Sequence, residues 1–285
     1  MPSAREIKRR IKSIKNTRQI TKAMQMVAAS KMRRAQVKVF DARPYADKVR
    51  DVLLHLSERY PEYRHPFLIS REVKKVGIIL VTTDKGLCGA LNANLIRQTV
   101  RFMLDQKVPT ALVTVGRRGR DFMKRFGREI LAEMTGLIDR PNLLDIVPAA
   151  KVAMDEYLQG RLDQVFVAYN QFVNTMVQKP VIEQIIPCPL PAGVERKQSW
   201  DYLYEPSSEE VLSALLPRYV EALVYHAVLE NIASEHSARM IAMKNATDNA
   251  KEIIYDLNLT YNKARQASIT KEMCEIAAGS AAVGK

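Results

Sequence analysis

A glycine-containing turn is the first segment of the chain that could bind a ligand. Thr83–Ala90 (TDKGLCGA) follows an apolar run and precedes a helical stretch, and main-chain amides at a helix N-terminus attract phosphate groups. The turn lacks the Gly-Lys-Ser/Thr of a P-loop, and neither Gly86-x-x-Gly89 nor Gly116-x-x-Gly119 has the Gly-x-Gly-x-x-Gly spacing of a dinucleotide site. We therefore interpret both segments as structural turns rather than as a nucleotide site.

Histidine and cysteine are not arranged for catalysis or metal binding either. His226 and His236 lie ten residues apart, which is not the i, i+4 spacing of a helical metal site, so we assign them packing or surface roles. Cys88, Cys188 and Cys274 match no disulfide or zinc framework, which favours a reducing compartment. With no triad and no paired-carboxylate site, we predict no catalytic residue, no cofactor and no metal.

The elements that hold these residues alternate in the middle of the chain, in a central domain assigned to residues 61–206. Apolar runs of strand length and helical stretches follow one another between turn residues. The predicted strands are 74–83, 110–115, 165–169 and 176–186, and the predicted helices are 90–106, 117–125 and 143–158. This alternation indicates an open α/β (Rossmann-like) sheet with helices on its faces.

Two long helical arms flank this domain. Residues 218–278 form a run of 61 positions without Gly or Pro, residues 3–43 also lack both, and nine of the eleven glycines fall within 77–193. Sixty-one helical residues would span roughly 90 Å. A helix of that length cannot bury itself in a domain of this size, so each arm must pair with the other arm or with a partner.

A heptad pattern runs along both arms. Stepping alternately by four and three residues gives apolar side chains at twelve of fifteen positions in 7–56 and at eleven of fifteen in 219–268. Arg18, Thr21 and Gln25 interrupt the first pattern, which indicates a stretch that faces something else. The two patterns predict an antiparallel coiled coil, in which the second arm is longer and its tip projects beyond the first.

Capping boxes and prolines suggest where these helices begin and bend. The N-terminal helix is assigned to residues 1–60 and the C-terminal helix to residues 207–285. Capping boxes are predicted at Ser3 with Glu6 and at Ser207 with Glu210. Pro44 is expected to bend the first helix without ending it, and Pro217 is expected to start or kink the second helix.

Charge is distributed unevenly along the chain. The net charge is +13, and residues 1–60 hold 16 Lys and Arg against 5 acidic residues, or +11. Such an arm would be attracted to an acidic surface, whether nucleic acid, anionic lipid or an acidic protein patch. No run approaches the roughly 18 to 20 apolar residues needed to cross a bilayer, so we predict no membrane span.

Five strings in this order give the chain a resemblance to one family over nearly its whole length. They are NTRQITKAMQMVAASKMRRAQ (16–36), TDKGLCGALN (83–92), SWDYLYEP (199–206), RMIAMKNATDNA (239–250) and YNKARQASITKEMCEIAAGSAA (261–282). The chain resembles the gamma subunits of bacterial F-type ATP synthase, which form the central rotor shaft. The centre has no cysteine-bearing insertion of the redox-regulated chloroplast kind, so a bacterial, non-photosynthetic origin is expected.

The resemblance implies that the coiled coil stands inside a ring of three alpha and three beta subunits. It also implies that the α/β domain lies at the base, against the epsilon subunit and the membrane c ring. The residues expected to contact beta subunits are Arg18, Lys22, Met24, Met26, Lys85, Gly86, Leu87, Cys88, Arg265, Gln266 and Thr270. Those expected near the c ring and epsilon at the base are Trp200, Asp201, Tyr202, Leu203 and Tyr204.

The function implied is transmission of torque between the c ring and the alpha/beta hexamer, by a subunit that performs no chemistry itself. By the same resemblance, the chain would be peripheral on the cytoplasmic face of the bacterial inner membrane and would bind no nucleic acid.

Three other functions remain open from the residues alone: a basic helical nucleic-acid-binding protein, an enzyme that uses the sheet as a nucleotide fold, and a coiled-coil scaffold. The first arm carries no aromatic residue before Phe40 that could stack on bases. Only the five strings argue against a scaffold.

Overall fold

The computed structural model describes residues 4–59, 65–136, 141–188 and 207–283. The chain divides into two compact units, one made of Met1–Ala28 with Met240–Lys285 and the other of Ala29–Arg239. Two long helices contribute to both units, α1 (Ala4–Arg59) and α5 (Ser208–Val283). Each unit has a hydrophobic core of its own.

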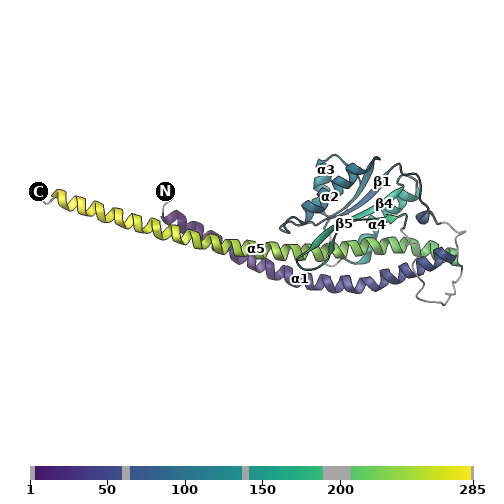
Figure 1. Ribbon diagram of the computed structural model, residues 1–285, viewed down its shortest axis with the longest axis horizontal. Coiled ribbons are helices and arrows are strands. Elements are labelled where there is room, and N and C mark those ends of the chain that lie inside the picture. Colours follow the sequence, from purple (N-terminus) through teal and green to yellow (C-terminus); the bar gives the residue numbers. More distant parts are fainter. Residues whose placement is uncertain (1–3, 60–64, 137–140, 189–206, 284–285) are drawn as a thin grey trace. The chain divides into compact units, whose positions relative to one another are not determined.

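A five-stranded sheet forms the centre of the larger unit (Figure 1). The strand order is β3-β2-β1-β4-β5, and all neighbours pair in parallel except β4 and β5, which are antiparallel. The strands are β1 (Val76–Val81), β2 (Thr110–Val115), β3 (Glu129–Met134), β4 (Gln164–Phe172) and β5 (Gln178–Ile186). The shorter helices are η1 (Pro66–Leu68), α2 (Leu91–Asp105), α3 (Arg117–Arg125) and α4 (Leu143–Leu158).

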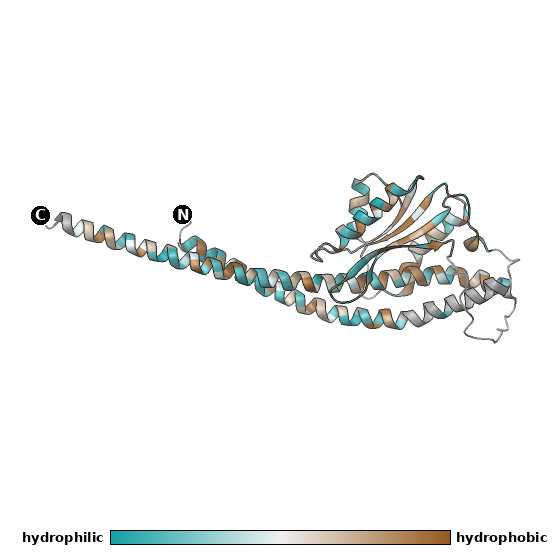
Figure 2. Ribbon diagram, viewed as in Figure 1, coloured by the Kyte–Doolittle hydropathy of each residue, from teal (hydrophilic) through white to brown (hydrophobic). Residues whose placement is uncertain are grey.

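Helices cover both faces of this sheet, so its central strands are buried on both sides. Ile78 and Leu80 of β1 pack in the core beneath α2 and α3. Ile79 and Val81 pack in a larger core with α4 and α5, which Val39 of α1 also joins. Figure 2 shows strands of largely hydrophobic residues beside a largely hydrophilic α3. The continuous apolar run of β1 is what a parallel strand covered on both faces requires.

Most predicted elements of the centre are present, but one strand was missed. The bounds of β2, α3 and α4 agree with the prediction, and β1, α2, β4 and β5 differ from it by a few residues at their ends. Strand β3 was not predicted, because EILAEM carries a Glu at both its first and fifth positions and lies at the edge of the sheet, where it is only partly buried. A half-buried edge strand gives a weak apolar signal.

Pro217 does not start the C-terminal helix, because α5 begins at Ser208 and continues through Pro217. The side chain of Ser207 accepts the backbone N–H of Glu210 at 3.2 Å and caps the helix. Leu216 and Val220 on either side of the proline are fully buried in the larger core. Their burial offsets the helix-interior penalty of proline, which is about 3 kcal/mol. Helix α1 likewise runs through Pro44, whereas Ser3 lies outside the described residues.

The smaller unit is an antiparallel pair of helices, as the heptad pattern predicts. The hydroxyl oxygens of Thr21 and Thr247 lie 2.8 Å apart and fix the register. Moving seven residues in opposite directions from this pair brings Ile14 opposite Ile254. The apolar cluster consists of Ile7, Ile11 and Ile254, with Ile14, Leu257, Tyr261 and Ala264 packed against it.

Helix α5 continues beyond the last of these contacts. Its residues 265–280 are all exposed, whereas α1 begins at Ala4. The tip of the second arm therefore projects beyond its partner helix, as expected. Within the parts of the chain that the structure describes, no helix combines the length and the apolar character needed to cross a membrane.

Candidate functional site

The turn between β1 and α2 has a fixed conformation. The hydroxyl of Thr83 donates to the carbonyl of Lys85 at 2.6 Å, and the side-chain amide of Asn92 donates to the Thr83 hydroxyl at 2.7 Å. Leu87 and Gly89 have φ angles of 64° and 61°, a backbone region that non-glycine residues rarely adopt. The side chain of Leu87 is thereby held on the surface with 62% of its area exposed.

Asp84 connects this turn to two neighbouring loops. Its Oδ1 accepts the backbone N–H of Arg117 at 2.9 Å and its Oδ2 accepts the backbone N–H of Gly136 at 2.8 Å. The next two amides of α3 are also bonded to residues that follow β1, Arg118 N–H to the carbonyl of Thr83 and Gly119 N–H to the hydroxyl of Thr82. The first three amides of α3 are thus occupied by the chain itself.

Arg239 of α5 holds the same turn from the other side. One of its terminal nitrogens donates to the carbonyl of Gly86 at 3.2 Å and to the carboxylate of Glu235 at 2.5 Å. The Arg239 and Glu235 side chains are only 12% and 14% exposed, so this ion pair is better shielded from solvent than a surface pair. Two strings that lie more than 140 residues apart, TDKGLCGALN and RMIAMKNATDNA, therefore meet at one contact.

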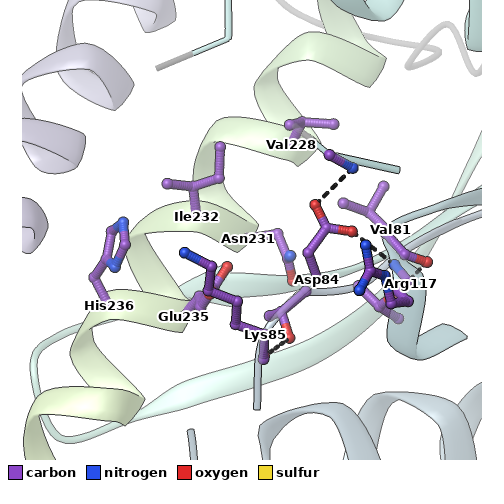
Figure 3. Close-up of a pocket in the computed structure, with 13 residues that line it drawn as sticks. Val81, Asp84, Lys85, Arg117, Val228, Asn231, Ile232, Glu235 and His236 are labelled. Atoms are coloured by element: carbon purple, nitrogen blue, oxygen red, sulfur yellow. Dashed lines mark hydrogen bonds between the residues drawn. The ribbon is translucent and has the colours of Figure 1, made fainter. Parts of the chain in front are cut away.

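A cavity of about 360 Å³ lies between this turn and α5 (Figure 3). Val81, Val228 and Ile232 give it apolar walls. Its polar lining comes from Asp84, Lys85, Arg117, Asn231, Glu235 and His236. Over the described ranges, no group of three or more His, Cys, Asp or Glu side chains could hold a metal ion.

A stripe of buried polar side chains attaches α5 to the end of β4. The carboxylate of Glu230, 1% exposed, accepts the backbone N–H of Phe172 at 2.7 Å. The side-chain carbonyl of Asn231 accepts the side-chain amide of Asn170 at 2.9 Å. Ser234 and Ser237 donate to the carbonyls of Asn170 and Thr175 at 2.9 and 2.7 Å. These directional bonds fix both the rotation and the position of α5 along its axis on the sheet.

The predicted partner-contacting residues fall in both units. In the smaller unit, Lys22 and Met26 are exposed and Arg18 and Met24 are half-buried. The other three predicted residues of this unit, Arg265, Gln266 and Thr270, are exposed on the projecting part of α5.

In the larger unit, the predicted turn residues differ in their exposure. Lys85 and Leu87 are exposed and Gly86 is half-buried, but Cys88 is only 3% exposed. Burial, together with the negative charge of Glu235, raises the pKa of the Cys88 thiol, although Arg239 partly opposes this. The predicted residues Trp200–Tyr204 lie outside the described residues.

Sequence reasoning missed the residues that fix α5 to the sheet. Glu230, Asn231, Ser234 and Ser237 follow the i, i+1, i+4, i+7 spacing of one helix face, so the polar stripe was visible in principle. The heptad pattern of the same stretch instead predicted that it pairs with the N-terminal helix. His226 lies 3.6 Å from Glu230 and His236 is 2% exposed, which agrees with packing roles for both histidines.

Comparisons with known proteins agree over the full length. A family model described as ATP synthase matches residues 3–283. The ATP synthase gamma chain of Dechloromonas aromatica is 53% identical over 99% of this chain and 100% of its own length. The ATP synthase gamma chain of Dehalococcoides mccartyi is 51% identical with the same coverage.

Solved structures show the same fold. The central stalk and c-ring structure of the Tetrahymena thermophila mitochondrial ATP synthase contains a chain that is 28% identical, with a TM-score of 0.63. The alignment covers 80% of this chain and 99% of that one. A chain in the rotor of the Euglena gracilis mitochondrial ATP synthase is 21% identical, covers 93% and 98%, has a TM-score of 0.64 and supports the fold alone.

Proposed function

Because this chain belongs to the ATP synthase gamma-chain family, we propose that it carries torque between a membrane c ring and a catalytic hexamer of alpha and beta subunits. It is a central-stalk rotor subunit of an F-type ATP synthase, and the complex as a whole is catalytic. Its own contribution is mechanical: it performs no chemistry and needs no cofactor. Rotation presents different sides of the shaft to each catalytic site in turn, and this drives conversion because those sides bind alternative site conformations differently.

The observation that carries this proposal is that one helix belongs to both units. The early part of α5 is fixed to the sheet by the Glu230–Ser237 stripe and by Arg239. Its later part pairs with α1 around the cluster at Ile7, Ile11 and Ile254 and then continues alone. If the sheet rotates, α5 would therefore rotate with it, because the bonds between them keep the sheet from turning independently of the helix.

The partners proposed for the shaft are beta subunits, contacted by two groups of residues. Exposed Lys22 and Met26, with half-buried Arg18 and Met24, form one group, and its basic character suits the acidic helix-turn-helix segments proposed for the beta subunits. The second group consists of Arg265, Gln266 and Thr270, which we place against a beta-subunit loop that surrounds the upper shaft and grips it. Lys85 and Leu87 would meet a beta subunit lower down, with Gly86 and Cys88 supporting the turn.

The base of the rotor is proposed to contact the c ring and the epsilon subunit through Trp200–Tyr204. The proposed division is a shaft formed by 1–60 and 207–285 and a base formed by 61–206. The protein would then act as a peripheral component on the cytoplasmic face of a bacterial inner membrane.

The test is coupling in the assembled, membrane-bound complex, measured as ATP-driven proton pumping relative to ATP hydrolysis. We expect the double change Arg265→Ala with Gln266→Ala to lower pumping per ATP several-fold, because two exposed contacts at the gripping level are lost. The matched control is Lys271→Ala on the same exposed part of α5, where only a surface pair with Glu275 is removed. Unchanged pumping per ATP in the double variant, at normal assembly, would refute the gripping role.

A further inference from the structure

The carboxylate of Asp84 joins three loops at the carboxyl-terminal ends of the strands. Strands β3, β2 and β1 are parallel neighbours, so the segments that follow them emerge side by side at their carboxyl ends. Asp84 follows β1, Arg117 begins α3 directly after β2, and Gly136 follows β3. The two oxygens of Asp84 accept the backbone N–H groups of Arg117 and Gly136 at 2.9 and 2.8 Å (Figure 3).

This edge is where open α/β sheets bind anionic ligands, because helix N-termini and free loop amides converge there. In this chain, that place is taken by a side chain of the protein. The amide of Arg117 at the start of α3 and the amide of Gly136 both point at the Asp84 carboxylate. The cavity of about 360 Å³ lies beside it and is lined by Asp84, Arg117 and Gly136.

The geometry points to Asp84 as a built-in anion that positions the Lys85–Leu87 turn. The carboxylate fixes the turn to the loops after β2 and β3, and Arg239 fixes the next residues to α5 through the carbonyl of Gly86. The backbone that carries the exposed side chains of Lys85 and Leu87 is thereby fixed. This inference rests on the proposed function, since it assigns Asp84 the task of presenting that turn to the catalytic ring.

A carboxylate is required here rather than any polar side chain. Both partners of Asp84 are N–H donors, and a carboxylate offers each of them a separate acceptor oxygen. Asparagine would keep one acceptor and direct an NH₂ group at the second donor. We therefore expect Asp84→Asn to leave one of the two amides protected from exchange and to expose the other, whereas Asp84→Ala should expose both.

The test uses the assembled complex carrying Asp84→Ala, with Asp105→Ala as control. Asp105 is an exposed acidic residue at the end of α2, so its removal matches the change of charge. Hydrogen exchange at the amides of Arg117 and Gly136 should accelerate at least about tenfold in the Asp84 variant, because each loses a bond to a charged acceptor. Pumping per ATP should fall in the same variant and not in the control.

Rescue by a small anion separates positioning from general damage. Formate has the size of the missing carboxylate, so adding sodium formate should restore both the slow exchange and the pumping of the Asp84→Ala complex. Sodium chloride at equal ionic strength should restore neither. If chloride rescues equally, or if exchange at the two amides is unchanged by the substitution, the built-in anion is refuted.

The coupling measurement separates this inference from the proposed function. Faster exchange with unchanged pumping in Asp84→Ala would overturn the positioning role, provided that Arg265→Ala with Gln266→Ala still lowers pumping. Unchanged pumping in both would also refute the gripping role of Arg265 and Gln266 that is part of the proposed function.

Discussion

Replacing Ile254 with alanine should open the helix pair of the smaller unit, whereas the same change at Ile253 should not. Ile254 is 7% exposed in the cluster with Ile7 and Ile11, and Ile253 is 47% exposed on the next position of the same helix. The two substitutions delete the same atoms and change helix propensity equally, so their difference isolates burial at the interface of α1 and α5.

The expected magnitude follows from the atoms removed. Ile→Ala deletes three carbons, and about 0.8 kcal/mol for each buried CH₂ gives about 2.4 kcal/mol. The better helix propensity of alanine returns about 0.4 kcal/mol. A net loss of about 2 kcal/mol is at the low end for buried isoleucine, as expected for a small cluster that can partly collapse. The Ile253 variant should stay within about 0.5 kcal/mol of the parent.

Hydrogen exchange of the full chain measures this opening directly. A loss of about 2 kcal/mol corresponds to roughly 30-fold faster exchange for amides protected by pairing, in segments 7–21 and 247–264. The amides of the sheet should be unaffected in both variants. Equal acceleration in the Ile253 and Ile254 variants would show that the register fixed by Thr21 and Thr247 does not hold in solution.

Three further predictions concern the larger unit and the free thiols. Alkylation of the native chain at neutral pH should modify the exposed Cys274 before Cys88 or Cys188. Burial raises the pKa of the Cys88 thiol and raises that of the Cys188 thiol to about 12. Peptide mass spectrometry measures the order of modification. Burial lowers the pKa of His65 below the ordinary 6.5. The free energy of unfolding should therefore be highest above about pH 6.5 and should fall as the pH decreases through that value, because the unfolded chain then binds a proton more readily than the folded one. Denaturant titrations at several pH values should show this slope in the parent and not in His65→Gln. Asn231→Ala should cost about 1–3 kcal/mol in the same titrations, because a buried side-chain amide of β4 loses its acceptor, and a loss under 0.5 kcal/mol would contradict the buried stripe.

The sequence predicts regular elements well where a single period dominates. The continuous apolar runs of β1 and β2 predicted buried strands, and the heptad positions around Ile14 and Ile254 predicted an antiparallel pair, as the structure shows. Both signals, the apolar run and the heptad spacing, can be read within a single strand or helix. Neither requires knowing which residues pack against it.

The contacts that fix the candidate site depend on pairs that are distant in sequence. Nothing local to Asp84 shows that its two acceptors meet Arg117 and Gly136, 33 and 52 residues away. The same is true of Arg239 and the carbonyl of Gly86, 153 residues apart. Sequence resemblance identified the strings that contain Asp84, Gly86 and Arg239, but only the fold shows which residues they bind.

The projecting part of α5 has a thermodynamic consequence. Residues 265–280 form a helix that no other helix in the described part of the chain covers, and Ile269, Met273 and Ile276 expose 48%, 64% and 73% of their area. A lone helix of about this length is marginal in water. If the proposed catalytic ring encloses this helix, the ring contributes to its folding, and by linkage the cost of ordering the helix lowers the affinity of the ring for it. We expect the largest load that the tip can sustain to be limited by a folding free energy, so that an overloaded tip unwinds before it detaches.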